Sequence, residues 1–221
     1  MVGTRIYTLR GVRLHCGPDD VPRSVQSMIF KGTYEAAEAD LVDEVVRPGT
    51  RVVEFGTGIG FISLLCRRLA GDGNVRSFEA NPAMEPVIRA NYALNGMEPD
   101  LVMKAVTPDG APLTFYRDDN ILSSSGFDRQ RDAEAIKIES ERIDRVVADF
   151  RPDVIVMDIE GAEVAVLTGA DLSRVRALVI ETHPHIVGEE ATASLIEDLA
   201  SQGFSQAAQR HKNVLMVRTD A

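Results

Sequence analysis

The stretch VVEFGTGIGF, residues 52–61, decides the fold that this sequence predicts. An apolar run leads into an acid, Glu54, and glycines then alternate at Gly56, Gly58 and Gly60 before an apolar helical pattern begins. Glycines at a strand-to-helix turn permit tight turns and let the backbone come close to a ligand. This order predicts a parallel α/β sheet whose first strand ends in a ligand-binding loop.

A second predicted strand, residues 75–79, also ends in a carboxylate. Its sequence is VRSFE. At the carboxyl end of this strand, Glu79 is placed to accept hydrogen bonds from both hydroxyls of a ribose. The two strand ends together predict a pocket for a ligand that carries a nucleoside.

The glycine spacing separates two kinds of ligand. Dinucleotide-binding loops have the pattern G-x-G-x-x-G, with a helix N-terminus facing a pyrophosphate. Here the third glycine comes one residue early, and Phe61 occupies the dinucleotide position. A carboxylate at Glu54 does not suit a pyrophosphate, but it suits a cation such as S-adenosylmethionine, which carries an ammonium and a sulfonium group. The alternative is a glycine turn that only packs a helix on a strand.

Composition narrows the class of partner. The chain has 221 residues, enough for one large domain spanning 1–221, and its net charge is −10. Nucleic acid is not expected as a partner, because neutralising phosphates requires clustered Lys and Arg. No membrane association is expected, since no apolar run approaches about 18 residues. The N-terminus lacks a signal-peptide pattern, so we predict a cytoplasmic protein. Cys16 and Cys66 form no C-x-x-C motif.

The rest of the chain alternates strand and helix patterns, which predicts a doubly wound α/β sheet. We predict seven sheet strands with the last one antiparallel. Residues 1–47 are expected to form an N-terminal hairpin and a helix cap, and residues 113–143 an insert of extra β structure or a lid. The predicted hairpin spans 5–16, the further strands 101–106, 153–158, 177–181, 205–211 and 213–218, and the helices 34–46, 61–69, 85–94, 161–167 and 192–202.

Residues 154–170, VIVMDIEGAEVAVLTGA, form the most specific string in the chain. It resembles the hallmark of FkbM-type methyltransferases, in which a strand ends in D-x-E-G-A-E and a helix then carries V-L-x-G-A. The resemblance extends over about residues 30–185. One departure is Glu54-Phe55, where many relatives have Asp followed by a small aliphatic residue. Further matching segments are GTYE at 32–35, EANP at 79–82, NYALN at 91–95, Ser123-Ser124-Ser125 and the strand that ends at Glu181.

This resemblance implies a class I methyltransferase (Rossmann-like) fold, S-adenosylmethionine as methyl donor, and usually O-methylation of a natural product or a sugar hydroxyl. The acceptor is then a small molecule, and a homodimer is left open. The alternatives are N-methylation of a small molecule, a nicotinamide-dependent oxidoreductase, and a non-catalytic protein that only binds the donor. The residues expected to contact the donor are Glu35, Glu54, Gly56, Gly58, Gly60, Glu79, Ala80, Asn81, Ala105 and Asp158.

The candidate catalytic residues are Asp158 and His183, which follow two successive predicted strands. Asp158 can bind the donor's ammonium group, act as the base for the acceptor, or only cap the strand end. His183 titrates near neutral pH and is a candidate base; the alternative is a histidine in a solvated loop. No metal is expected by default. If one is present, its ligands are Asp158, Glu181 and His183, but a histidine suits Mg²⁺ poorly, so Mg²⁺ is not favoured. Glu163 is expected to be stabilised mainly by the dipole of the helix that it begins.

Overall fold

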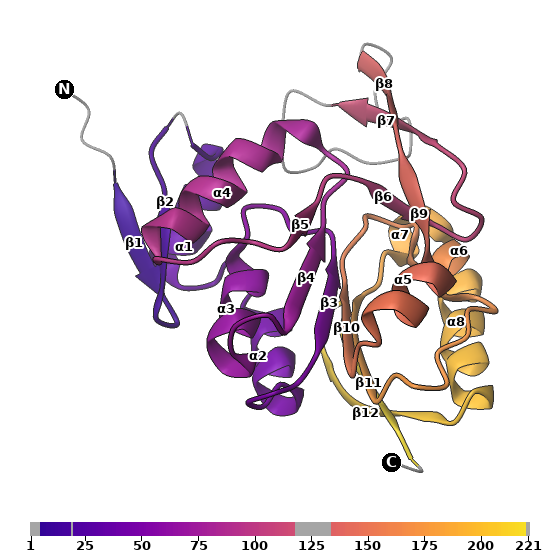
Figure 1. Ribbon diagram of the computed structural model, residues 1–221. Helices are drawn as coiled ribbons and strands as arrows, with labels where there is room; N and C mark the ends of the chain where they lie inside the picture. Colours follow the sequence, from indigo (N-terminus) through magenta and orange to yellow (C-terminus); the bar gives the residue numbers. More distant parts are fainter. Residues whose placement is uncertain (1–4, 19, 118–133, 220–221) are drawn as a thin grey trace.

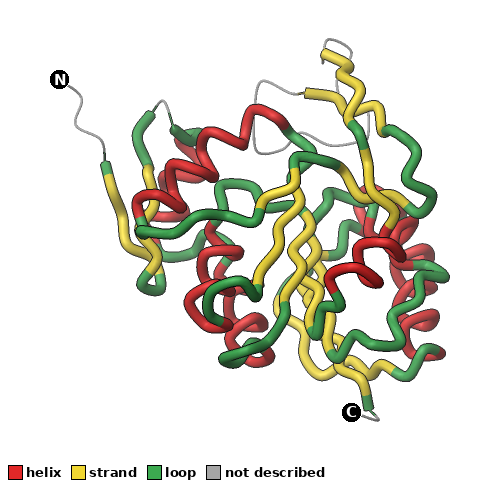
Figure 2. Tube along the Cα trace, in the orientation of Figure 1, coloured by secondary structure: helices red, strands yellow, loops and turns green. Residues whose placement is uncertain are grey.

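The computed structural model describes residues 5–18, 20–117 and 134–219. Its centre is a seven-stranded sheet with the order β12-β13-β11-β10-β3-β4-β5 (Figures 1 and 2). The strands from β11 to β5 are parallel, and β13 is antiparallel to both of its neighbours. This confirms the predicted sheet with its antiparallel last strand. The strands are β3 (Val52–Phe55), β4 (Val75–Phe78), β5 (Leu101–Val102), β10 (Val154–Met157), β11 (Ala177–Glu181), β12 (Phe204–Arg210) and β13 (Asn213–Arg218).

Helices cover both faces of the sheet. Successive strand residues point to opposite faces, so Val154 packs in one apolar cluster and Ile155 in the other. All four residues of β10 are buried, as expected for a central strand covered on both sides. In Figure 1, α2 (Ala36–Val45), α3 (Phe61–Ala70) and α4 (Glu85–Leu94) lie on one side of the sheet, and α5 (Ile143–Phe150), α6 (Glu163–Leu167) and α8 (Glu189–Ser201) on the other.

The predicted N-terminal hairpin is formed by β1 (Ile6–Leu9) and β2 (Val12–His15), which pair antiparallel. Asn91 on α4 attaches this hairpin to the loop at 56–60. Its Nδ2 donates to the Ile59 carbonyl (2.8 Å), and its Oδ1 accepts from the His15 N–H (2.7 Å). Asn91 is 0% exposed, so both bonds are shielded from water.

The structure divides the strand predicted at 101–106. β5 joins the main sheet, whereas β6 (Ala105–Thr107) pairs in parallel with β9 (Ser140–Arg142) in a separate two-stranded sheet. The chain turns between them, where the Lys104 N–H donates to the Val102 carbonyl (3.0 Å). The apolar pattern that predicted one strand continues across this turn, because the segments on both sides of it are apolar. The strand prediction was therefore wrong in its length.

The predicted insert contains extra β structure. β7 (Leu113–Arg117) and β8 (Glu134–Ile138) pair antiparallel. The serines at 123–125 lie outside the described residues, so their correspondence with the family pattern has no structural counterpart here.

The helix α5 (Ile143–Phe150) was absent from the predictions, and so was α1 (Arg23–Lys31). Its buried residues, Val25 and Ile29, are four positions apart on one helix face. The helix predicted at 34–46 begins later, at Ala36, because Glu35 has a left-handed backbone (φ 46°). Two shorter elements complete the fold near the carboxyl edge, the 3₁₀-helix η1 (Pro82–Met84) and α7 (Pro184–Val187). Within the described ranges, no helix has both the length and the apolar character needed to cross a membrane.

Candidate functional site

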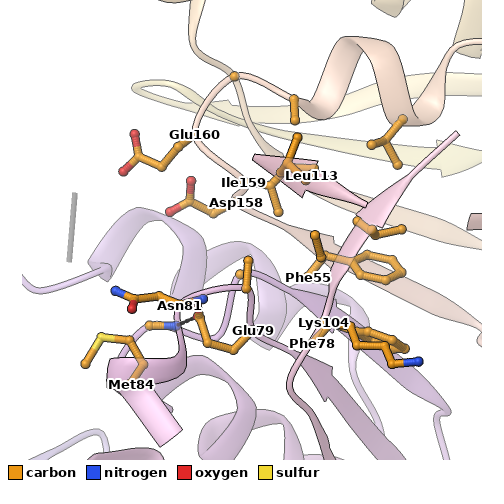
Figure 3. A pocket seen from close by; sticks show the side chains of 18 of the residues that line it. Phe55, Phe78, Glu79, Asn81, Met84, Lys104, Leu113, Asp158, Ile159 and Glu160 are labelled. Atoms are coloured by element: carbon orange, nitrogen blue, oxygen red, sulfur yellow. Dashed lines mark hydrogen bonds between the residues drawn. The ribbon is translucent and has the colours of Figure 1, made fainter. Parts of the chain in front are cut away.

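A cavity of about 760 Å³ lies at the carboxyl ends of β3, β4 and β10 (Figure 3). Ligands of open α/β sheets bind at this edge, where the strand order reverses. Here that point lies between β3 and β10. All the predicted donor contacts except Glu54 and Gly60 line the cavity. Those that line it are Glu35, Gly56, Gly58, Glu79, Ala80, Asn81, Ala105 and Asp158.

The glycine loop between β3 and α3 depends on backbone conformations that glycine adopts without strain. Gly56, Gly58 and Gly60 have φ values of 89°, 55° and 84°. A Cβ atom on Gly56 would lie 1.7 Å from the carbonyl oxygen of Asp158. Any side chain there would push β10 away from β3, so Gly56 fixes the distance between these strands as well as the turn.

Glu79 holds the glycine loop and the end of β4 together. Its Oε2 accepts the N–H of Gly58 (2.9 Å), and its Oε1 accepts the N–H of Asn81 (2.7 Å). Burial raises the pKa of Glu79, and its backbone N–H donors oppose that rise. The carboxylate is therefore fixed in place and lines the cavity, where its remaining lone pairs are available (Figure 3). Its contact with a ribose stays a prediction.

Glu54 lies beneath the loop and does not line the cavity. It shares a strand face with Val52, which packs in the cluster containing α3 and α4. Glu54 is 2% exposed, and neither carboxyl oxygen has a hydrogen-bond partner among the described residues. Burial raises the pKa of Glu54 to about 7, although the nearby Ser77 and Thr57 oppose the rise. The structure thus separates Glu54 from the predicted donor contacts. The period-two alternation of β3 was the sequence signal for this separation.

Five titratable residues meet where β10 and β11 end, and we call them the His183 cluster: Asp158, Glu160, Glu163, Glu181 and His183. His183 is 2% exposed, so it is not a solvated loop residue. Its Nδ1 lies 3.1 Å from Glu163 Oε1. Its Nε2 faces three carboxylates, at 3.6 Å from Asp158 Oδ1, 3.6 Å from Glu181 Oε1 and 3.8 Å from Glu160 Oε2.

Glu163 has a larger role than the sequence suggested. Besides facing His183, its Oε1 accepts the backbone N–H groups of Ile159 (2.9 Å) and Gly161 (3.2 Å). The residue is 1% exposed. It therefore fixes both the turn after β10 and the orientation of the imidazole. Helix position alone could not show this, because His183 is distant in sequence.

The His183 cluster carries an excess of negative charge. Burial raises the pKa of Asp158 to about 8, and the charges of Glu181 and Glu160 add to the rise. Burial lowers the pKa of His183, but the hydrogen bond to Glu163 and the charges of Glu163 and Asp158 outweigh it, so this pKa is raised overall. Such a cluster favours a positively charged ligand or a bound proton.

Glu35 reaches the cavity from the start of α2. Its Oε1 lies 4.0 Å from the Cβ position of Gly58, and the Tyr34 hydroxyl lies 3.7 Å from the same position. Burial raises the pKa of Glu35 to about 8, and the charge of Asp158 contributes to this rise. Residues 34–35 thus lie over the glycine loop, and the contact of Glu35 with the donor stays a prediction.

An apolar wall completes the cavity, and the sequence analysis did not identify it. The wall includes Val25 and Met28 of α1, Val164 and Ala165 of α6, and Val187 of α7. The three-residue step from Val25 to Met28 was a signal for α1, but its polar surroundings hid it.

A family model, the methyltransferase FkbM domain, matches residues 54–206, which is more than half of the chain. The chain belongs to the FkbM methyltransferase family. The match includes the glycine loop, Glu79 and the whole His183 cluster. No curated protein matches the chain significantly.

Two solved methyltransferase structures are similar to this FkbM-family chain. Precorrin-6y C5,15-methyltransferase from Geobacter metallireducens GS-15 has a TM-score of 0.51 and 14% identity, covering 89% of this chain and 90% of that one. Magnesium protoporphyrin IX methyltransferase from Synechocystis PCC 6803, solved with bound S-adenosylmethionine, has a TM-score of 0.47 and 15% identity, covering 89% and 85%. At such identities, likeness concerns the fold alone. The first structure supports a class I methyltransferase fold.

Proposed function

We propose that this chain is a methyltransferase that moves the methyl group of S-adenosylmethionine to a hydroxyl oxygen of a small, largely apolar molecule. The family and the fold support methyl transfer from this donor. The observation that carries the choice of acceptor is the cavity itself. It joins the glycine loop to an apolar wall and to the carboxylate of Asp158.

The residues at the ends of β3 and β4 fit an adenosyl donor. Gly58 presents bare backbone to the cavity, so a ligand can approach the loop closely. Glu79 is held rigidly and can accept hydrogen bonds from ribose hydroxyls. Asp158 Oδ1 is buried and has no hydrogen-bond partner among the described residues, so it is available to a ligand in the cavity.

The apolar wall supports a hydrophobic acceptor. Binding removes apolar surface from water, and this contributes about 25 cal/mol per Å². The net charge of −10 makes a polyanionic acceptor such as nucleic acid unfavourable. Both observations support a small neutral molecule.

Methyl transfer needs no covalent bond to the protein, because the sulfonium of the donor supplies an activated methyl group. Aligning acceptor and donor can lower the barrier by roughly 7–11 kcal/mol. A hydroxyl acceptor also loses a proton, and a positioned base contributes about 10²–10⁴-fold. We assign Asp158 as the group that faces the acceptor hydroxyl, with His183 Nε2 3.6 Å behind its Oδ1.

The test uses wild-type protein, donor labelled in the methyl group, and a panel of phenols, aliphatic alcohols, sugars and amines, with a metabolite extract beside them. We expect label on an oxygen of a largely apolar compound. Label on nitrogen would overturn the choice of atom. Binding of S-adenosylhomocysteine without transfer to any acceptor would favour a protein that only binds the donor. If calorimetry shows that S-adenosylhomocysteine does not bind, the proposal is wrong.

A further inference from the structure

The His183 cluster contains a set of atoms arranged for a metal ion. One ligand atom each from Asp158, Glu160 and His183 lies within 4.8 Å of the other two. Ligands on opposite sides of one ion lie roughly 4–5 Å apart. Small side-chain rotations would therefore bring all three onto one ion. Figure 3 shows the Asp158 and Glu160 carboxylates on the same side of the cavity.

The imidazole of His183 is the observation that distinguishes this cluster from a group of acids. It is 2% exposed, and the Nε2 atom points at carboxylate oxygens that are all 3.6 Å or more away, beyond hydrogen-bond distance. Nδ1 is held by Glu163 (3.1 Å), which is itself fixed by two backbone N–H groups. A carboxylate on one ring nitrogen that leaves the other for a metal is the usual second-shell arrangement of metal-binding histidines.

Asp158 has no lysine or arginine partner among the described residues. Asp158 Oδ1 is buried and accepts no hydrogen bond from any described residue. Lys212 forms an ion pair with Glu181 of the cluster, but no ion pair joins a lysine or arginine to Asp158 within the described ranges. A divalent cation would satisfy Asp158 and His183 Nε2 at once.

We propose that Asp158, Glu160 and His183 bind one divalent first-row transition-metal ion at the edge of the cavity. Carboxylates with one imidazole suit Mn²⁺, Fe²⁺, Co²⁺ or Zn²⁺ better than Mg²⁺. Asp158 and Glu160 line the cavity, so the ion's open positions face the acceptor side. Its role there, which rests on the proposed function, is to hold the acceptor's hydroxyl oxygen and lower the pKa of that hydroxyl. Asp158 then acts on the acceptor through the ion.

Binding is tested directly, without any acceptor. The full chain is treated with EDTA, dialysed, and titrated with Mn²⁺ by calorimetry and by electron paramagnetic resonance. We expect one Mn²⁺ per chain. Affinity falls about tenfold or more in Glu160→Gln and Asp158→Asn, whereas the matched control Glu189→Gln, at an exposed position, binds like wild type. No Mn²⁺ binding by wild type, or equal binding by all folded variants, overturns the site.

A second measurement needs no variant. The chain has four histidines, so ¹⁵N spectra of the imidazoles are simple. Zn²⁺ should shift one Nε2 resonance while its Nδ1 remains hydrogen-bonded. The absence of any such shift contradicts the proposal.

Titration of S-adenosylhomocysteine into the same samples separates the two proposals. Product binding without Mn²⁺ binding overturns the metal site and leaves the proposed function. Mn²⁺ binding without product binding overturns the proposed function and leaves the metal site.

Discussion

The two sides of the cavity differ in which part of the chain forms them. The side at β3 and β4 consists of backbone: a glycine loop whose Gly58 N–H is held by one carboxylate, Glu79. The side at β10 and β11 consists of side chains: four carboxylates around one buried histidine. The first side fixes the shape of the cavity, and at Gly56 it leaves no room for a side chain. The second side sets the charge of the cavity, and the protonation of its side chains depends on what binds there.

The strictest test of the backbone side is Gly56→Ala. Its Cβ would lie 1.7 Å from the Asp158 carbonyl at a φ of 89°. We expect a loss of about 3–5 kcal/mol in the free energy of unfolding, from left-handed strain plus overpacking. The control is Gly49→Ala, at a φ of 86° with nothing within 4 Å, which should cost about 1–2 kcal/mol. Urea unfolding measures the loss in both variants. Equal losses would show that β3 and β10 can move apart at little cost in free energy.

Asp158→Asn tests the side-chain side. We expect methyl transfer to fall by about 10²–10⁴-fold, whether Asp158 acts directly or through an ion. Affinity for S-adenosylhomocysteine should change little, as measured by calorimetry. The opposite result, weak product binding with an unchanged rate, would place Asp158 at the donor's ammonium group.

Glu54→Gln tests whether the acid beneath the loop is separate from those in the cavity. Its folded pKa, about 7, lies above the ordinary 4.5. The stability from the neutral carboxyl is fully present below about pH 4.5 and is lost as the pH rises through 7. At pH 8 the variant should exceed wild type by up to about 3 kcal/mol in the free energy of unfolding, and at pH 4.5 the two should agree. Urea unfolding between pH 4.5 and pH 8 checks this prediction, with Glu197→Gln as the control at an exposed position. If the free energies of unfolding of wild type and Glu54→Gln change with pH in parallel, the prediction is wrong.

Glu79→Ala should have the smallest of these effects. It leaves the N–H groups of Gly58 and Asn81 without their acceptor, at a cost of about 1–3 kcal/mol in the free energy of unfolding. Because it also removes the predicted ribose contact, we expect weaker binding of S-adenosylhomocysteine. Glu85→Ala, at the first residue of α4, should bind as wild type does, because this side chain is 40% exposed and does not line the cavity. Unchanged affinity in a folded Glu79→Ala protein would count against a ribose contact.

The sequence predicted the backbone side well, because its determinants are local. Three alternating glycines and an acid at a strand end require no knowledge of distant contacts. The doubly wound sheet with its antiparallel last strand also followed from the alternation of strand and helix patterns, but its strand order did not. The direction of Glu54 could have been read from strand periodicity, since it shares a face with Val52.

The side-chain side was predicted only in part, because it depends on tertiary contacts. Asp158 and His183 were identified, but the burial of His183 follows from its contact with Glu163, twenty positions earlier. The apolar wall was missed since α1 lies in a polar segment. The turn at Lys104 was missed because apolar residues continue on both sides of it.

The buried amide of Asn91 joins the N-terminal hairpin to the glycine loop. The family match begins at residue 54, after the hairpin, and no described hairpin residue lines the cavity. Yet one carboxamide bonds both β2 and the glycine loop. We therefore expect the hairpin to stabilise the glycine loop, although it lies outside the segment matched by the family model. Removing the hairpin alone would take this support from the loop, so we expect affinity for the donor to fall through the loss of residues that do not line the cavity.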